Sequence, residues 1–291
     1  MPSVVNRGYS INYEITCPSS GPTLLLVAGL GEQIDSVEFP REQCELFADD
    51  GFQVVRMDNR ESGLSQPIGD NKSSTDEFTL KEMASDVVAV AKDLNADKIH
   101  IVGASMGGFI GRWVALMYPE RVSSLAVVMS GSGAGADDVG PQIKEAVIQN
   151  LIDMTVRREK LDAINHTIEI WRWLWGSKYP FDEDWIRSVA TSSYHRSYRP
   201  EGIASLLGTM AATPSLWNEQ KKISCPTLVL HGGVDECFES EHGEAIASRI
   251  PNATLWHDPK MGHIMHKEQW PELAERVATM AGLNEEEGSG R

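Results

Sequence analysis

The residue of this chain best suited to nucleophilic chemistry is the serine in Gly103-Ala104-Ser105-Met106-Gly107. It follows a short β-branched run at 98–102, which predicts a buried strand, and precedes a stretch at 108–118 whose apolar residues recur with the period of a helix. In such a strand–turn–helix the glycines permit a turn tight enough to hold the serine hydroxyl in an exposed, strained position. We therefore predict that Ser105 is a catalytic nucleophile.

A serine hydroxyl is a weak nucleophile at neutral pH, so it needs a histidine base, and the histidine needs a carboxylate that holds its tautomer. In proteins with this turn the partners follow in the order serine, acid, histidine, each on a loop after a later strand. Asp235 comes just after the strand pattern at 227–231, beyond two glycines that free the loop. We expect Asp235 to be the carboxylate.

The base is expected to be His263, which follows the strand pattern at 253–257 and is preceded by Gly262. The glycine gives the loop a turn through which the imidazole can reach inward. His266, three residues later and nearer the last helical pattern, is a competing candidate.

The developing negative charge on a substrate oxygen needs two backbone N–H donors. The residue after the nucleophile, Met106, supplies one of them. We assign the second to Leu30, in the loop Ala28-Gly29-Leu30-Gly31 that follows the strand pattern at 23–27. Gly31 is the alternative donor and is expected to contact the substrate.

The elements that position these residues alternate between strand and helix patterns. Strand patterns occur at 10–16, 23–27, 53–57, 98–102, 122–129, 227–231 and 253–257, and helical patterns at 38–49, 79–94, 108–118, 240–249 and 271–281. Such alternation predicts an α/β fold with a mostly parallel sheet, of eight strands, covered by helices on both faces.

The alternation is interrupted between residues 131 and 217, where only helical patterns occur. We expect an α/β core made of 1–130 and 218–283 and a helical cap made of 131–217, inserted over the carboxyl edge of the sheet. The polar, low-complexity tail at 284–291 is predicted to be disordered.

The predicted cap is rich in large aromatic side chains. Trp171, Trp173 and Trp175 cannot all face one way on a single helix, because successive ones lie about 200° apart. Some of them therefore pack the cap, and others line a pocket, which is typically apolar and aromatic. We expect Trp171, Trp175 and Trp185 to bind substrate, and we expect that substrate to be hydrophobic, with an aromatic or medium-chain acyl group and a small leaving alcohol.

The formal net charge of −16 argues against binding nucleic acid or an anionic membrane surface, since both are polyanionic. The N-terminal residues lack the pattern of a signal peptide, and no apolar run is long enough to span a bilayer, so a cytoplasmic location is expected. The four cysteines show neither metal-ligand spacing nor a disulfide framework, so we expect free thiols. No metal or organic cofactor is implied, and the chain is expected to be a monomer or homodimer.

These residues together resemble the α/β-hydrolase superfamily over essentially the whole chain. The segment Asp58-Asn59-Arg60-Glu61-Ser62-Gly63-Leu64-Ser65 resembles the D-x-R-G-x-G-x-S turn of that superfamily, with Glu61 in place of the usual glycine. This departure is similar to the aclacinomycin methylesterase-like group, which implies an α/β-hydrolase fold and the cleavage of methyl esters on large aromatic molecules. Asp58 and Arg60 are expected to be structural ion-pair and turn residues.

Three functions fit this pattern. The first is a serine hydrolase that cleaves carboxylic esters, and lactones as well, through an acyl-enzyme intermediate. The second is a carbon–carbon bond hydrolase of aromatic degradation, which resembles this chain in Ser105-Met106-Gly107-Gly108 but commonly carries tryptophan after the catalytic histidine, where this chain has Ile264. The third is a non-catalytic ligand-binding protein of the same fold, against which the presence of all three triad residues argues.

Overall fold

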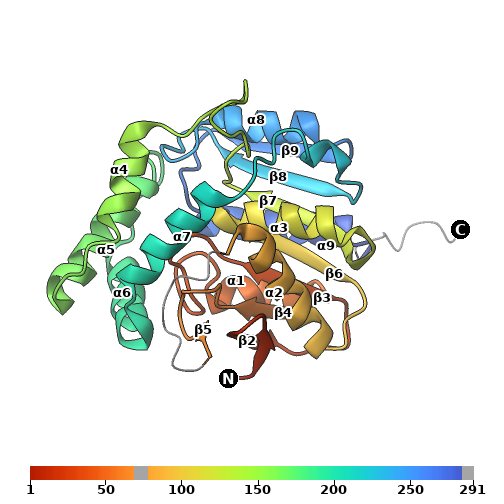
Figure 1. The fold of residues 1–291 in the computed structure, drawn as a ribbon, viewed down its shortest axis with the longest axis horizontal. Coiled ribbons are helices and arrows are strands. Elements are labelled where there is room, and N and C mark those ends of the chain that lie inside the picture. Colours follow the sequence, from red (N-terminus) through yellow and green to blue (C-terminus); the bar gives the residue numbers. More distant parts are fainter. Residues whose placement is uncertain (69–77, 284–291) are drawn as a thin grey trace, which may run out of the picture.

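The computed structural model describes residues 1–68 and 78–283, which form one central sheet with helices around it (Figure 1). Its strands in these ranges are β1 (Ser3–Asn6), β2 (Tyr9–Cys17), β3 (Thr23–Val27), β4 (Gln53–Met57), β5 (Gln66–Pro67), β6 (Ile99–Ala104), β7 (Val122–Val128), β8 (Thr227–Gly232) and β9 (Ala253–Asp258). Eight lie in the order β1-β2-β4-β3-β6-β7-β8-β9, and β5 pairs with β2. Neighbours from β4 to β9 are parallel, whereas β1, β2 and β5 pair antiparallel, so the prediction of a mostly parallel sheet is confirmed.

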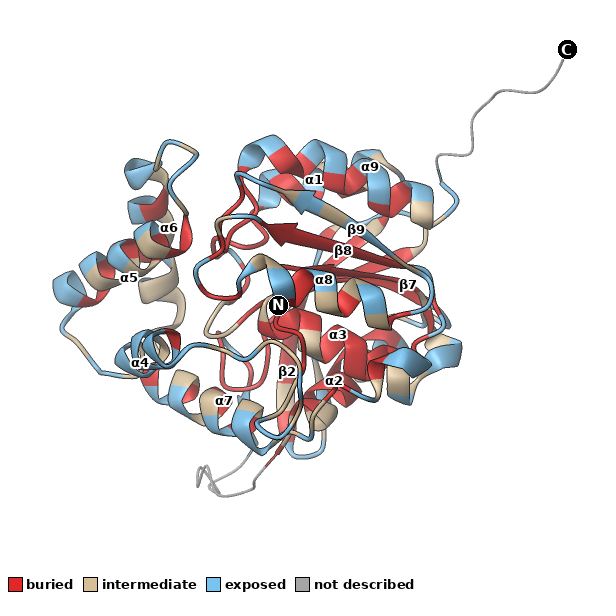
Figure 2. Cartoon of the chain, turned by 90° about the horizontal axis from the view of Figure 1, so that it is seen from above, coloured by how far each residue is buried: buried red, intermediate tan, exposed pale blue. Residues whose placement is uncertain are grey.

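Helices cover both faces of the sheet. The helices α1 (Arg41–Asp49) and α9 (Trp270–Met280) lie on one face, and α2 (Leu80–Asp93), α3 (Met106–Met117) and α8 (Ser240–Arg249) lie on the other (Figure 2). Successive side chains of a strand point to opposite faces. In β3, Leu24 and Leu26 therefore join the core beneath α1 and α9, while Leu25 and Val27 join the core beneath α2 and α3. This two-sided burial explains the continuous apolar runs of the central strands.

A helical segment separates β7 from β8 in the chain. It contains α4 (Glu145–Asp153), α5 (Lys160–Leu174), α6 (Glu183–Ser197) and α7 (Pro200–Ala212), and the structure places no strand between Met129 and Pro226. Figure 2 shows α4, α5 and α6 beside the end of the sheet toward which β8 points. The helical interruption predicted from the sequence is present at that end, where parallel strands present their carboxyl-terminal loops.

Two local predictions differ from the structure. The strands β1 and β5 were not expected, because four and two residues are too few to show an alternating pattern. The first helix begins at Arg41 and not at Glu38, because Pro40 disfavours a helical backbone at the residue before it. Glu38 therefore lies in the loop 28–40, which leads from β3 to α1.

None of the described helices is long and apolar enough to cross a membrane. The tail at 284–291, predicted to be disordered, lies outside the described residues.

Candidate active site

Ser105 lies in the turn between β6 and α3, and the glycines around it are dictated by close packing. A Cβ added at Gly103 would lie 2.3 Å from the carbonyl oxygen of Gly107, and one added at Gly107 would lie 1.9 Å from the carbonyl oxygen of Val27. Ser105 has a φ of 52°, in a region that residues other than glycine seldom adopt. The turn thus holds the serine in a strained conformation at the end of a central strand.

The structure brings Ser105, His263 and Asp235 into one hydrogen-bonded chain. The Nε2 atom of His263 is 3.0 Å from Oγ of Ser105, and its Nδ1 atom is 2.8 Å from Oδ2 of Asp235. The other carboxylate oxygen, Oδ1, accepts hydrogen bonds from the backbone N–H groups of Cys237 and Phe238, each at 2.8 Å. Since the carboxylate fixes Nδ1 as the donor, Nε2 is left to accept the serine proton.

The sheet explains why residues so distant in sequence meet. β6, β7, β8 and β9 are parallel neighbours, so the loops after them meet at one edge. Asp235 follows β8, His263 follows β9, and both residues are buried, each with 4% of its surface exposed. The backbone N–H of His263 also donates to the carbonyl oxygen of Leu174 at 2.7 Å, which joins this loop to the end of α5.

The competing histidine lies elsewhere. His266 packs between Trp175 and Tyr179, with ring centroids 4.9 Å and 4.3 Å away, and burial lowers its pKa to about 4. Among the described residues no hydrogen-bond partner is found for either of its ring nitrogens. The geometry therefore joins His263, and not His266, to Ser105.

The loop 28–40 passes directly beside the nucleophile. A Cβ added at Gly29 would lie 3.0 Å from Cβ of Ser105. The N–H groups of Leu30 and Met106 make no hydrogen bond to the described part of the chain, and both residues line the cavity that opens at Ser105. Gly31 lines it too and has a φ of 76°, a conformation for which glycine carries no penalty. Two backbone donors are thus free at the side of the cavity next to the serine.

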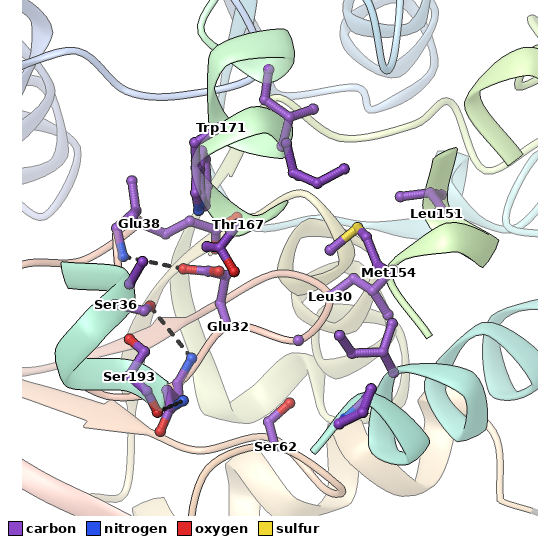
Figure 3. Close-up of a pocket in the computed structure, with 18 of the residues that line it drawn as sticks. Leu30, Glu32, Ser36, Glu38, Ser62, Leu151, Met154, Thr167, Trp171 and Ser193 are labelled. Atoms are coloured by element: carbon purple, nitrogen blue, oxygen red, sulfur yellow. Dashed lines mark hydrogen bonds between the residues drawn. The ribbon is translucent and has the colours of Figure 1, made fainter. Parts of the chain in front are cut away.

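The cavity at Ser105 has a volume of about 170 Å³ and lies between the sheet edge and helices α4 to α7. One side is apolar and includes Leu30, Leu151 and Met154 (Figure 3). The other side is polar, and its lining residues include Glu32, Ser36, Glu38, Ser62 and Ser193. Such a cavity suits a molecule with a hydrophobic body and a polar group.

Of the three tryptophans expected to bind substrate, only Trp171 lines this cavity. Trp175 and Trp185 line a second cavity, of about 360 Å³, together with His266. Trp175 comes four residues after Trp171, about 6 Å further along the axis, and Trp185 is in the first turn of α6. Both therefore lie at the same end of the α5–α6 pair, where their ring centroids are 6.3 Å apart. Neither of these two rings belongs to the lining of the cavity at Ser105.

Sequence reasoning did not identify Glu32 or Glu38 as site residues. Burial raises the pKa of the Glu38 carboxyl well above its usual range, and the neighbouring Glu32 carboxylate raises it further. Burial also raises the pKa of Glu32. The sequence shows only that two acids occur in the loop after β3. It does not show that they line a cavity, because that depends on helices far away in the sequence.

The residues of the Asp58–Ser65 motif form ion pairs, as expected. Asp58 binds Arg196 with 2.7 Å between Oδ2 and Nη2, and Arg60 binds Asp86 with 2.5 Å between Nε and Oδ2. Both pairs are largely buried, so they link the motif to α6 and α2. The prediction that Asp58 and Arg60 are structural ion-pair residues is confirmed.

Comparison with known proteins gives one family and several distant relatives. Residues 22–269 match the family described as "alpha/beta hydrolase fold". Rhodomycin D methylesterase DnrP of Streptomyces peucetius is 26% identical over 269 residues, 85% of this chain and 86% of that protein. 3-oxoadipate enol-lactonase 2 of Acinetobacter baylyi is 26% identical over 89% of this chain and 88% of its own. The solved structure of a hydrolase from Pseudomonas aeruginosa PA01 gives a TM-score of 0.74 at 21% identity and covers 96% of this chain and 97% of that one, which shows a likeness of fold.

Proposed function

This chain belongs to the alpha/beta hydrolase fold family, and from that premise we propose that it is a serine hydrolase cleaving carboxylic esters of hydrophobic or aromatic small molecules. The expected resemblance to the aclacinomycin methylesterase-like group is confirmed by the methylesterase relative. The observation that carries the proposal is the contact chain from Ser105 through His263 to Asp235, with distances of 3.0 Å and 2.8 Å.

The proposed reaction has two steps. In the first, Ser105 Oγ attacks the ester carbonyl carbon while its proton passes to Nε2 of His263, and the N–H groups of Leu30 and Met106 stabilise the oxyanion. The tetrahedral intermediate then expels the alcohol, which takes the proton from His263, and leaves an acyl group on Ser105. In the second step, water gives a proton to His263 and attacks the acyl group. The resulting tetrahedral intermediate releases the carboxylic acid as its bond to Ser105 Oγ breaks, and His263 returns the proton to that oxygen.

We further propose that 1–130 and 218–283 act as the catalytic core and 131–217 as a cap that selects the substrate. This division is supported by the position of the lining residues. Helices α4 to α7 contribute Leu151, Met154 and Trp171 to the cavity, whereas the reacting groups come from loops at the sheet edge. In this scheme the same chemistry serves any ester, including a cyclic one, that the cap admits.

The test is active-site labelling with a fluorophosphonate, followed by peptide mass analysis and hydrolysis assays on methyl and p-nitrophenyl esters. We expect one modified peptide, containing Ser105, and loss of both labelling and turnover in Ser105→Ala. Ser248→Ala, an exposed serine of α8, is the matched control and should behave like the unmodified protein. Labelling at another serine, or full turnover by Ser105→Ala, would overturn the proposal.

A further inference from the structure

The polar side of the cavity has no role in the proposed ester-cleaving steps, although it lies next to the nucleophile. Glu32 and Glu38 come from the loop 28–40, Ser62 follows β4 and Ser193 belongs to α6. Figure 3 shows Glu32, Glu38, Ser36 and Ser193 on one side of the cavity, and Leu30, Met154 and Leu151 on the other. The inference below rests on the proposed function and concerns which esters this site accepts.

The two carboxyl groups have different hydrogen-bond donors around them. Glu38, with 4% of its surface exposed, accepts a hydrogen bond from the N–H of Gly29 at 2.5 Å, and both burial and the nearby Glu32 favour its neutral form. Glu32 accepts the N–H of Val37 at 3.1 Å. Burial raises its pKa too, and hydrogen bonds from Ser36, Val37 and the backbone of Glu38 act in the opposite direction. Glu32 therefore offers acceptor oxygens held by several donors, whereas Glu38 has a single backbone donor.

No cation of the described residues pairs with Glu32 or Glu38. Two arginines line the cavity, and both are bound to other acids. Arg158 donates to both carboxylate oxygens of Asp153 at 2.9 Å, and Arg199 pairs with Glu61 at 2.7 Å. Neither Glu32 nor Glu38 takes part in any ion pair among residues 1–68 and 78–283. The carboxylate of Glu32 is therefore available to a positively polarised group.

Two hydroxyl groups that line the cavity also lack partners. Ser62 has only 3% of its surface exposed, and its Oγ makes no hydrogen bond within the described part of the chain; the same holds for Oγ of Ser193. Figure 3 shows the hydroxyl of Ser62 directed toward the cavity. A buried hydroxyl without a partner costs about 1–3 kcal/mol, so this arrangement is typical of a group that bonds to a ligand.

We propose that Glu32, Ser62 and Ser193 form a subsite for a hydrogen-bond donor carried by the substrate's hydrophobic body, namely a hydroxyl or a primary ammonium group. The carboxylate of Glu32 accepts from the donor, and the two serine hydroxyls accept from it or donate to its oxygen. A carboxylate at the same place has no hydrogen to donate to these acceptor oxygens and would be desolvated beside two acids without a cation, so the subsite rejects it. The protein is thus a hydrolase of hydroxylated or amine-bearing esters, and not of esters that carry a second carboxylate.

The test compares four methyl 3-phenylpropanoates that differ only in the para substituent: methyl, hydroxymethyl, aminomethyl and carboxylate. At pH 7 we expect kcat/KM for the hydroxymethyl and aminomethyl esters to exceed that of the methyl ester by about tenfold, the effect of one good hydrogen bond. The kcat/KM of the carboxylate-substituted ester should be about tenfold or more below that of the methyl-substituted ester. Equal kcat/KM for all four esters would overturn the proposal.

Two variants assign the effect to the named residues. In Glu32→Gln, the ratio of kcat/KM between the aminomethyl and the methyl ester should fall to less than about threefold. The difference in kcat/KM between the methyl and the carboxylate ester should become smaller as well. In Ser62→Ala the advantage of the hydroxymethyl ester should fall. Glu145→Gln, which removes an exposed acid of α4, should keep the wild-type ratios. If Glu32→Gln keeps those ratios too, Glu32 does not form the subsite.

Binding separates this inference from the proposed function. Calorimetry of the four esters with Ser105→Ala measures selectivity without turnover. The same order of affinity in that variant supports the subsite even if the wild-type protein hydrolyses none of the esters, a result that would refute the proposed function alone. Turnover of all four esters at similar rates, with similar affinities, would refute the subsite and leave the esterase proposal in place.

Discussion

At the scale of single residues, the candidate site combines two buried acids with different numbers of hydrogen-bond donors. Asp235 is buried but receives three hydrogen bonds, two from backbone N–H groups and one from His263. Glu38 is buried with a single backbone donor and a carboxylate beside it. Hydrogen-bond donors stabilise a charged carboxylate, and burial without them stabilises the neutral form. The two acids are therefore suited to different tasks.

Asp235→Asn should lower kcat by about four orders of magnitude, the usual result when an amide replaces the triad carboxylate. An amide cannot stabilise the imidazolium that forms when His263 takes the serine proton. The measurement is steady-state hydrolysis of a p-nitrophenyl ester, with Asp137→Asn, at an exposed loop position, as the control. A loss below about tenfold would show that Asp235 does not orient the base.

Glu38→Gln should stabilise the fold at pH 7 and have no such effect near pH 4. Because the pKa of Glu38 is raised in the folded protein, stability is lost as pH rises above the ordinary glutamate pKa, about 4.3. A neutral amide can still accept the N–H of Gly29, and it removes this loss. We expect thermal unfolding at pH 7 to shift upward by about 2–4 °C, and the shift to vanish near pH 4. An equal shift at both pH values would contradict a raised pKa.

At the scale of elements, the antiparallel pair α5–α6 decides which aromatic side chains line the cavity at Ser105. Trp171 lines the cavity, whereas Trp175 and Trp185, at the other end of the pair, pack around His266. The end of α5 also contacts the loop of the base, through the hydrogen bond from His263 N–H to the Leu174 carbonyl. The helices therefore shape the cavity and support the histidine together.

Trp171→Ala should raise KM for an aryl ester by about tenfold and for an acetate ester by less than about threefold. The indole covers the part of the cavity where a bulky acyl group would lie, and losing that apolar contact costs about 1.4 kcal/mol. Trp173→Ala, on the same helix but outside the cavity lining, is the control. Thermal unfolding of both variants separates binding from stability. Equal changes in KM for both esters would contradict a selective role for Trp171.

At the scale of the whole molecule, the core keeps most of the thiols away from solvent. Cys44, Cys225 and Cys237 are buried, and Cys17 is half-buried. Burial raises the pKa of Cys44 to about 12 and raises that of Cys237 well above its usual range. The thiolate is the reactive form of cysteine. Burial therefore lowers the reactivity of these thiols in two ways, because it keeps reagents away from the sulfur and because it keeps the thiol protonated.

A disulfide reagent at pH 8 should therefore react with at most one thiol of the native protein, Cys17, and with all four after unfolding. Esterase activity should survive the native reaction. In the control variant Cys17→Ser, the reaction of the native protein with the disulfide reagent should disappear. Rapid loss of activity that substrate prevents would point to Cys237, which lines the cavity, and would contradict this expectation.

The sequence by itself determined the features that follow from local pattern. The alternation of strands and helices predicts the parallel sheet, since period and length distinguish these elements. The turn at Ser105 was visible because its glycines are contiguous with the strand and helix that define it. Asp235 and His263 were identifiable because parallel strands bring their carboxyl-terminal loops to one edge, so order along the chain indicates proximity.

Only the tertiary structure decided what each side chain faces. The loop that carries Glu32 and Glu38 contacts α6, through hydrogen bonds from Gln33 to the carbonyl oxygens of Ser193 and Ser197, and α6 comes more than a hundred residues later in the chain. The separation of Trp171 from Trp175 depends on where the cavity ends along α5, and that end is set by a loop after β9. Solvent exposure, and with it protonation and access to substrate, arises from contacts between distant elements. A linear pattern does not contain those contacts.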